Sequence, residues 1–130
     1  MRGIVIYCSV FGNNRETAEK TAKSKKYDII EFFPGGKARI FLSFFTAGKL
    51  RKMAKAMNLI KYDNVVLCGP VWAGKPCPAL MALLKNLDLN GKNVSCLMTY
   101  STDHGHSEKI ARQEILKNKG KIKEIRFRKV

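Results

Sequence analysis

Short apolar, β-branched runs alternate with helix-like segments five times along this chain, and this alternation constrains the fold more than any other feature. The expected strands are the run that begins at Ile4 and the runs at 28–33, 64–68, 93–98 and 121–128. The expected helices are 15–24, 37–58, 79–87 and 108–118. Strands that alternate with helices predict a parallel sheet with right-handed crossovers and helices on both faces.

The chain has 130 residues and contains no linker, repeat or low-complexity segment, so residues 1–130 are expected to form one domain. No stretch approaches the ~20 apolar residues that a membrane span needs. The first apolar run ends in a polar turn rather than at a small-residue cleavage site, so no signal peptide is expected.

The four cysteines are widely spaced and form no CxxC pair. They are Cys8, Cys68, Cys77 and Cys96. Three of them lie in apolar runs, where cysteine is usually a small buried hydrophobe. We therefore expect no metal site and no disulfide framework, and we expect the reducing cytoplasm as the location.

The turn after the first strand has the composition of an anion site. Ser9, Asn13 and Asn14 supply short hydrogen-bonding side chains beside Gly12, just before the helix begins. Free N–H groups at a helix N-terminus point toward such a turn, which predicts a phosphate site. The same three side chains could instead only cap the helix, and the residues leave both interpretations open.

In a doubly wound sheet the ligand lies beyond the carboxyl ends of the strands, where the strand order reverses. Three segments are expected there: 9–14, 69–78 and 99–106. The second contains three prolines, two glycines and the only tryptophan, Trp72, whereas the third contains Tyr100. A phosphate site flanked by aromatic loops suits a planar, phosphorylated ligand.

These residues resemble the flavodoxins and the wider flavodoxin-like FMN-binding group over nearly the whole chain. Family members open with a Ser/Thr-x-Thr-Gly-Asn-Thr phosphate loop, which Ser9, Gly12 and Asn13 match. Phe11 and Asn14 stand where threonines are usual. The string Gly-Pro-Val-Trp-Ala-Gly-Lys-Pro-x-Pro at 69–78 is similar to the loop by which one branch of the group borders the flavin ring.

The resemblance implies an α/β, flavodoxin-like fold: a doubly wound, five-stranded parallel sheet in the order 2-1-3-4-5 with helices on both faces. It also implies FMN as the cofactor. The implied cofactor-binding residues are Ser9, Val10, Phe11, Gly12, Asn13, Asn14, Pro70, Val71, Trp72, Ala73, Gly74, Thr99, Tyr100, Ser101 and Gly105.

Within this implied site each segment has a role. The first segment would hold the phosphate, and Gly74 would let the backbone approach the ring closely. Trp72 would stack on or flank the isoalloxazine, although it could also be an ordinary hydrophobic anchor. Tyr100 and Gly105 would form the other wall. No catalytic acid or base is expected, because simple electron transfer requires none.

The net charge is unusual for this group, because 25 Lys and Arg against 10 Asp and Glu leave +15. Flavodoxins are typically acidic and dock on basic redox partners. We therefore expect an FMN-binding redox protein that carries electrons between protein partners and meets a partner that is acidic at the docking face. Lysines that only solvate helix faces would also explain the charge.

Two other functions stay open. An FMN-dependent NAD(P)H reductase of quinones or other small acceptors could use His104 and His106 near the ring. A flavodoxin-fold module without FMN could bind an anionic partner. Nucleic acid is not the expected partner, because no aromatic platforms interleave the basic residues. Cys8 and Cys77 have no third group to orient them, and both are expected to be structural.

Overall fold

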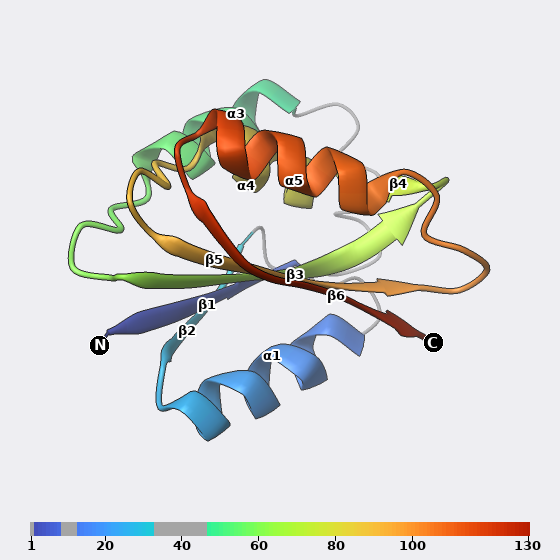
Figure 1. Cartoon of the computed structure of the whole chain (residues 1–130), viewed down its shortest axis with the longest axis horizontal. Helices are drawn as coiled ribbons and strands as arrows, with labels where there is room; N and C mark the ends of the chain where they lie inside the picture. Colours follow the sequence, from blue (N-terminus) through green and yellow to red (C-terminus); the bar gives the residue numbers. More distant parts are fainter. Residues whose placement is uncertain (1, 9–12, 33–46) are drawn as a thin grey trace.

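The computed structural model describes residues 2–8, 13–32 and 47–130. Its sheet is built on five parallel strands, β1 (Gly3–Tyr7), β2 (Asp28–Glu31), β3 (Asn64–Trp72), β5 (Asn93–Tyr100) and β6 (Lys121–Lys129). They lie in the order β2-β1-β3-β5-β6, and every neighbouring pair is parallel (Figure 1). Counted along the chain this is the order 2-1-3-4-5, so the predicted doubly wound sheet is confirmed.

Helices cover both faces of the sheet, as predicted (Figure 1). Helix α1 (Asn13–Lys25) lies on one face. On the other face lie α3 (Ala47–Ala56), α4 (Pro78–Asn86) and α5 (Ser107–Lys117). No helix within the described ranges is long and apolar enough to cross a membrane.

Each face of the sheet has its own hydrophobic core. Val65 and Leu67 of β3 belong to the core under α3, α4 and α5, whereas Val66 and Cys68 belong to the core under α1. The central strands are therefore buried on both faces, which explains why their sequences are apolar without alternation. The edge strand β6 alternates between exposed and partly buried residues, as its sequence pattern predicted.

Residues 69–78 were predicted as a loop, and this prediction is wrong for most of the segment. Strand β3 continues to Trp72 and forms an antiparallel hairpin with β4 (Lys75–Pro76). Pro70 fits within β3 because the pairing with β1 has already ended at Cys68, so its missing N–H removes no bond to that strand. Ala73 and Gly74, with φ of 53° and 76°, make the two-residue turn.

Other boundaries differ by a few residues. Helix α1 begins at Asn13 rather than Arg15, so both asparagines belong to its first turn. Helix α3 begins at Ala47 and ends before Asn58. The predicted part of that helix at 37–46, residue 33 of the second strand, and Ser9, Val10, Phe11 and Gly12 lie outside the described residues.

Candidate functional site

Three described segments meet the carboxyl edge of the sheet: the start of α1, the β3–β4 hairpin, and the loop between β5 and α5. The order of the strands reverses between β1 and β3, because β2 lies to one side of β1 and β3 to the other. Open α/β sheets bind ligands at this kind of switch point. The described parts of the three predicted segments therefore lie at the edge that the sequence predicted, whereas residues 9–12 of the first segment lie outside the described residues.

Asn14 is a buried polar residue in the first turn of α1, with 3% of its surface exposed. Its Nδ2 donates a hydrogen bond of 2.9 Å to Oγ1 of Thr99 at the end of β5. Its Oδ1 is also buried and has no hydrogen-bond partner within the described part of the chain. A buried polar atom without a partner costs about 1–3 kcal/mol, so Oδ1 of Asn14 marks a position where a further polar group would be stabilising.

The hairpin and the β5–α5 loop are joined through two glycines. The carbonyl oxygen of Gly74 accepts hydrogen bonds from the N–H of His106 at 2.9 Å and from Oγ of Ser107 at 3.2 Å. Gly105 has a φ of 52°, and a Cβ at this position would lie 2.6 Å from the Cα of Gly74. Only glycine fits there, because both the backbone conformation and the space exclude a side chain.

The joined loops line a pocket of about 280 Å³. Its lining residues are Val71, Ala73, Gly74, Ser101, Thr102 and Asp103. Four of these residues, Val71, Ala73, Gly74 and Ser101, were predicted from the sequence. Thr102 and Asp103 were not. Both missed residues lie in the predicted 99–106 segment, and nothing in the local sequence distinguishes them from other polar loop residues.

Asp103 shapes this loop directly. Its Oδ1 accepts a hydrogen bond of 2.6 Å from the N–H of Gly105, which closes an Asx turn. The turn holds Gly105 in the conformation that brings it against Gly74. Asp103 thus has a structural reason to be present, besides its place in the pocket lining.

The two predicted aromatic neighbours of a ligand do not line this pocket. The Tyr100 ring meets the edge of His104 at a centroid distance of 5.2 Å, and His104 stacks on Phe127 of β6 at 3.9 Å. Trp72 is half-buried and packs against the core under α4. His104 is thus packed between aromatic rings, and His106 precedes α5 as its N-cap residue.

No protein-family model matches the chain, and no curated protein matches it by sequence. Solved structures do match. A provisionally assigned flavoprotein from Bacteroides uniformis gives a TM-score of 0.75 at 18% identity, covering 98% of this chain and 90% of that one. The two-electron reduced flavodoxin of Megasphaera elsdenii gives 0.68 at 14% identity, covering 96% and 84%. A flavoprotein from Lactobacillus acidophilus in complex with FMN gives 0.62 at 16% identity, covering 97% and 92%.

The chain has the flavodoxin-like fold. The resemblance in sequence and the likeness in structure agree on this point, and both extend over nearly the whole chain. The predicted strand order and the position of the predicted segments at the carboxyl edge are the features that the sequence and the structure share.

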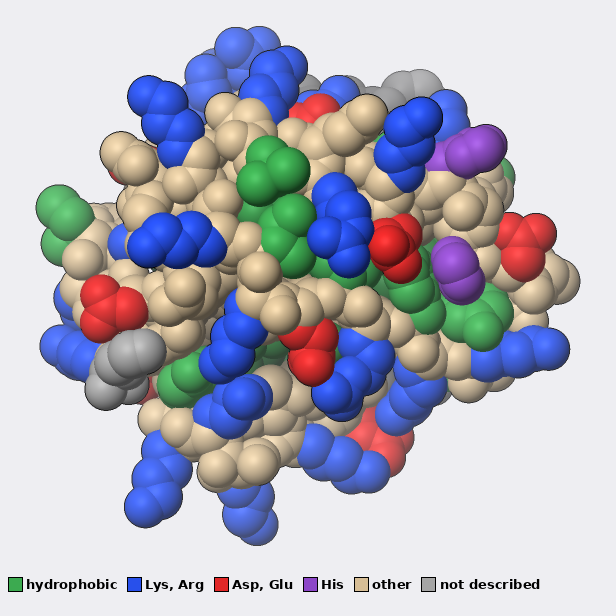
Figure 2. All heavy atoms as spheres, viewed as in Figure 1, with side chains coloured by type: hydrophobic (Ala, Val, Ile, Leu, Met, Phe, Trp, Pro, Cys, Tyr) green, Lys and Arg blue, Asp and Glu red, His purple; other side chains and the backbone are tan. Residues whose placement is uncertain are grey.

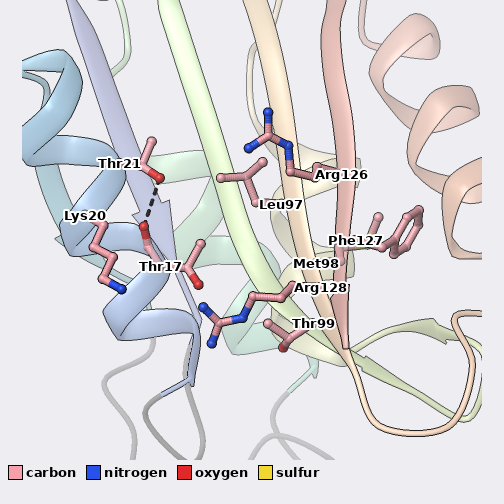
Figure 3. A pocket seen from close by; sticks show the side chains of 9 residues that line it. All are labelled: Thr17, Lys20, Thr21, Leu97, Met98, Thr99, Arg126, Phe127 and Arg128. Carbon is pink, nitrogen blue, oxygen red and sulfur yellow. Dashed lines mark hydrogen bonds between the residues drawn. The ribbon is translucent and has the colours of Figure 1, made fainter. Parts of the chain in front are cut away.

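The surface of this flavodoxin-like chain is strongly basic. Figure 2 shows Lys and Arg side chains spread over the face in view, with fewer Asp and Glu between them. A groove of about 170 Å³ lies between α1 and β6 (Figure 3). It is lined by Thr17, Lys20, Thr21, Leu97, Met98, Thr99, Arg126, Phe127 and Arg128.

Three cations border this groove: Lys20 from α1, and Arg126 and Arg128 from β6 (Figure 3). All three residues are exposed, and Arg126 pairs at 2.8 Å with Glu124 while 69% of its side chain remains exposed. The lining residue Thr99 is the one that binds Asn14, so the groove reaches the carboxyl edge. The groove could not be predicted from the sequence, because its two sides come from α1 and β6, which lie near opposite ends of the chain.

Proposed function

We propose that this chain is an FMN-binding redox protein that carries electrons between protein partners. The observation that carries the proposal is the buried amide of Asn14, whose Oδ1 has no hydrogen-bond partner among the residues that the structure describes. The Thr99 hydroxyl can donate as well as accept, so the amide can turn without losing Thr99. Turned in this way, it offers an Nδ2 hydrogen to a phosphate oxygen, while Oδ1 accepts from the Thr99 hydroxyl.

The position of Asn14 supports the same assignment. The first turn of α1 carries N–H groups without helical partners and the positive end of the helix dipole, both of which favour an anion. Ser9 and Gly12 enter the proposal from the sequence motif alone. A flavoprotein with this fold from Lactobacillus acidophilus is bound to FMN, which agrees with a phosphate-bearing flavin here.

FMN would supply the redox chemistry when bound, and this chain would hold and shield it. The pocket between the hairpin and the 101–103 segment would border the ring, with Gly74 allowing close approach of the backbone. Pro70 of β3 and Thr99 of β5 pair with each other and would support these two segments from the sheet. Trp72 and Tyr100 stay candidate ring neighbours, because each belongs to one of the two segments that border the pocket.

Titration of the flavin-free protein with FMN tests this function. We expect perturbed flavin absorption bands and quenched tryptophan fluorescence at one equivalent, because Trp72 is the only tryptophan and lies in the hairpin. Riboflavin, which lacks the phosphate, should bind more weakly. A protein that leaves the FMN spectrum unchanged would overturn the proposal, and equal affinity for both flavins would overturn the phosphate assignment.

The partner we propose is a protein with an acidic docking face, seated on the groove between α1 and β6. Lys20, Arg126 and Arg128 supply the complementary charge, and Leu97 lies buried at the floor of the groove (Figure 3). Charge complementarity of this kind speeds association and selects partners. The groove favours a protein over nucleic acid, because no described aromatic ring stands exposed in it as a stacking platform.

Charge reversal in the groove tests this docking site. Binding of poly-L-glutamate should weaken about tenfold in a Lys20→Glu/Arg128→Glu variant. The matched control is Lys85→Glu/Lys117→Glu, which makes the same charge change on the opposite face of the sheet. Equal weakening in both variants would show a net-charge effect and contradict the groove. Tighter binding of duplex DNA than of poly-L-glutamate would favour the anion-binding module instead.

A further inference from the structure

Two cysteines that the sequence left unrelated lie together in the fold. Cys8 follows the last residue of β1, and Cys77 is the N-cap residue of α4. Both are buried, with 4% and 2% of their surfaces exposed. Both side chains belong to the same buried cluster, where the Cys8 thiol is placed to donate a hydrogen bond to the Cys77 sulfur.

The backbones of the two cysteines are hydrogen-bonded to the same strand. The N–H of Cys8 donates to the carbonyl of Cys68 at 2.8 Å, and the N–H of Cys77 donates to the carbonyl of Pro70 at 2.9 Å. The two acceptors are two residues apart on β3, which corresponds to about 6.6 Å along a strand. The two cysteines are therefore held at neighbouring points along one strand, which is the range over which disulfides form, with Cα separations up to about 6.8 Å.

The two thiols differ in their surroundings. The hydrogen bond from Cys8 lowers the pKa of Cys77, and the N–H groups of Leu80 and Ala79 at the start of α4 lower it further against the effect of burial. A sulfur is too weak an acceptor to make a regular cap, but these N–H groups still favour a thiolate. The same hydrogen bond, followed by burial, raises the pKa of Cys8.

The other two cysteines provide an internal comparison. Burial raises the pKa of Cys68 to about 12, and it also raises the pKa of Cys96. Neither of them has a thiol hydrogen bond of the kind that joins Cys8 and Cys77. The contact, the backbone spacing and the helix start therefore single out one pair among four buried cysteines.

We propose that Cys77 and Cys8 are an oxidisable dithiol that a small peroxide converts to a disulfide. The Cys77 thiolate attacks one oxygen of hydrogen peroxide, the O–O bond breaks, and hydroxide leaves, so Cys77 becomes a sulfenic acid. The Cys8 sulfur then attacks the Cys77 sulfur; the S–S bond forms and the S–O bond breaks. The sulfenic oxygen leaves as water with the Cys8 proton.

The overall step is balanced: two thiols and one hydrogen peroxide give one disulfide and two waters. The two sulfurs lose two electrons and the peroxide oxygens gain them. A peroxide is the suitable oxidant because it is only slightly larger than water, whereas both sulfurs are too buried for a bulky disulfide reagent. Cys8 lies directly before residues 9–12 in the chain, but the proposed oxidation of the dithiol does not depend on the proposed FMN function.

Mass spectrometry of the flavin-free protein after peroxide treatment and alkylation of remaining thiols tests the proposal. We expect the loss of two hydrogen masses, a peptide that joins Cys8 to Cys77, and recovery of both thiols with a reductant. Cys68 and Cys96 should remain free and take up the alkylating reagent after unfolding. Four alkylated thiols after treatment, or a link between any other pair, would overturn the proposal.

Two single variants test the assigned roles. In Cys8→Ser the disulfide cannot form, so Cys77 should gain one or two oxygen masses, whereas in Cys77→Ser the remaining Cys8 should stay unmodified. Cys68→Ser is the matched control and should form the disulfide as the unaltered protein does. A Cys77 in the Cys8→Ser variant that is as unreactive as Cys96 would contradict its role as the nucleophile.

Discussion

Gly105→Ala is expected to weaken FMN binding at least tenfold and to lower the free energy of unfolding by about 2 kcal/mol. The added Cβ would lie 2.6 Å from the Cα and 2.8 Å from the carbonyl oxygen of Gly74, and φ at this position is +52°. Both contacts involve backbone, so the loops must separate to relieve them. Because the pocket lies between these loops, its shape should change with them.

Gly91→Ala is the matched control for this prediction. Gly91 has a φ of +74°, but a Cβ there would meet nothing within 4 Å. The Gly91→Ala variant should therefore lose about 1–2 kcal/mol of unfolding free energy for the backbone conformation alone, and it should keep its affinity for FMN. Urea unfolding and FMN titration separate the two effects. Unchanged FMN affinity in Gly105→Ala, with the expected loss of stability, would mean that the loop junction does not border the ring.

Asn13→Asp is expected to weaken FMN binding about a hundredfold, which corresponds to about 2.7 kcal/mol. Asn13 begins α1, and it matches the asparagine of the family phosphate loop. A carboxylate there would face the phosphate dianion across the short distance that the proposal requires. The stability of the flavin-free protein should not fall, because an acidic residue in the first turn of a helix is favourable by about 0.3–1 kcal/mol.

Two controls isolate the phosphate in this experiment. Asn90→Asp makes the same charge change in an exposed turn before β5, at the amino edge of the sheet, and should leave the FMN affinity unchanged. Riboflavin has no phosphate, so its affinity should be nearly the same in Asn13→Asp and in the unaltered protein. An equal loss for FMN and riboflavin would assign Asn13 a structural role in place of the phosphate contact.

The fold could be predicted from the sequence because its main constraint is local. Strands buried on both faces require continuous β-branched runs such as the one at 64–68, and the helices between them require a different spacing of apolar residues. With right-handed crossovers, few topologies remain. Local sequence gave a wrong prediction for the β3–β4 hairpin, because Gly69 and Pro70 are typical of loops. They fit within β3 only because its pairing with β1 ends at Cys68.

The candidate site was predicted from the residues as a set of segments, and the individual cofactor-binding residues came from the family resemblance. The place of the segments at the carboxyl edge follows from the strand directions, which the sequence predicts. The individual contacts depend on which face each side chain takes. Tyr100 shares the face of Met98 in β5 and therefore meets Phe127 of β6 and His104, a grouping that the loop composition did not indicate. Thr102 and Asp103 enter the pocket because an Asx turn and a glycine contact set the path of the loop.

The sequence by itself determined the class of fold and the edge of the sheet where a ligand would lie, because these depend on patterns within single segments. The strand order came from the resemblance to the flavodoxins, and the structure confirms it. The tertiary structure alone decided which residues from distant segments touch. It paired Asn14 with Thr99, Gly74 with Gly105, and Cys8 with Cys77. Each of these contacts depends on the register between strands and on backbone conformation at a turn, and neither quantity is encoded in the composition of one segment.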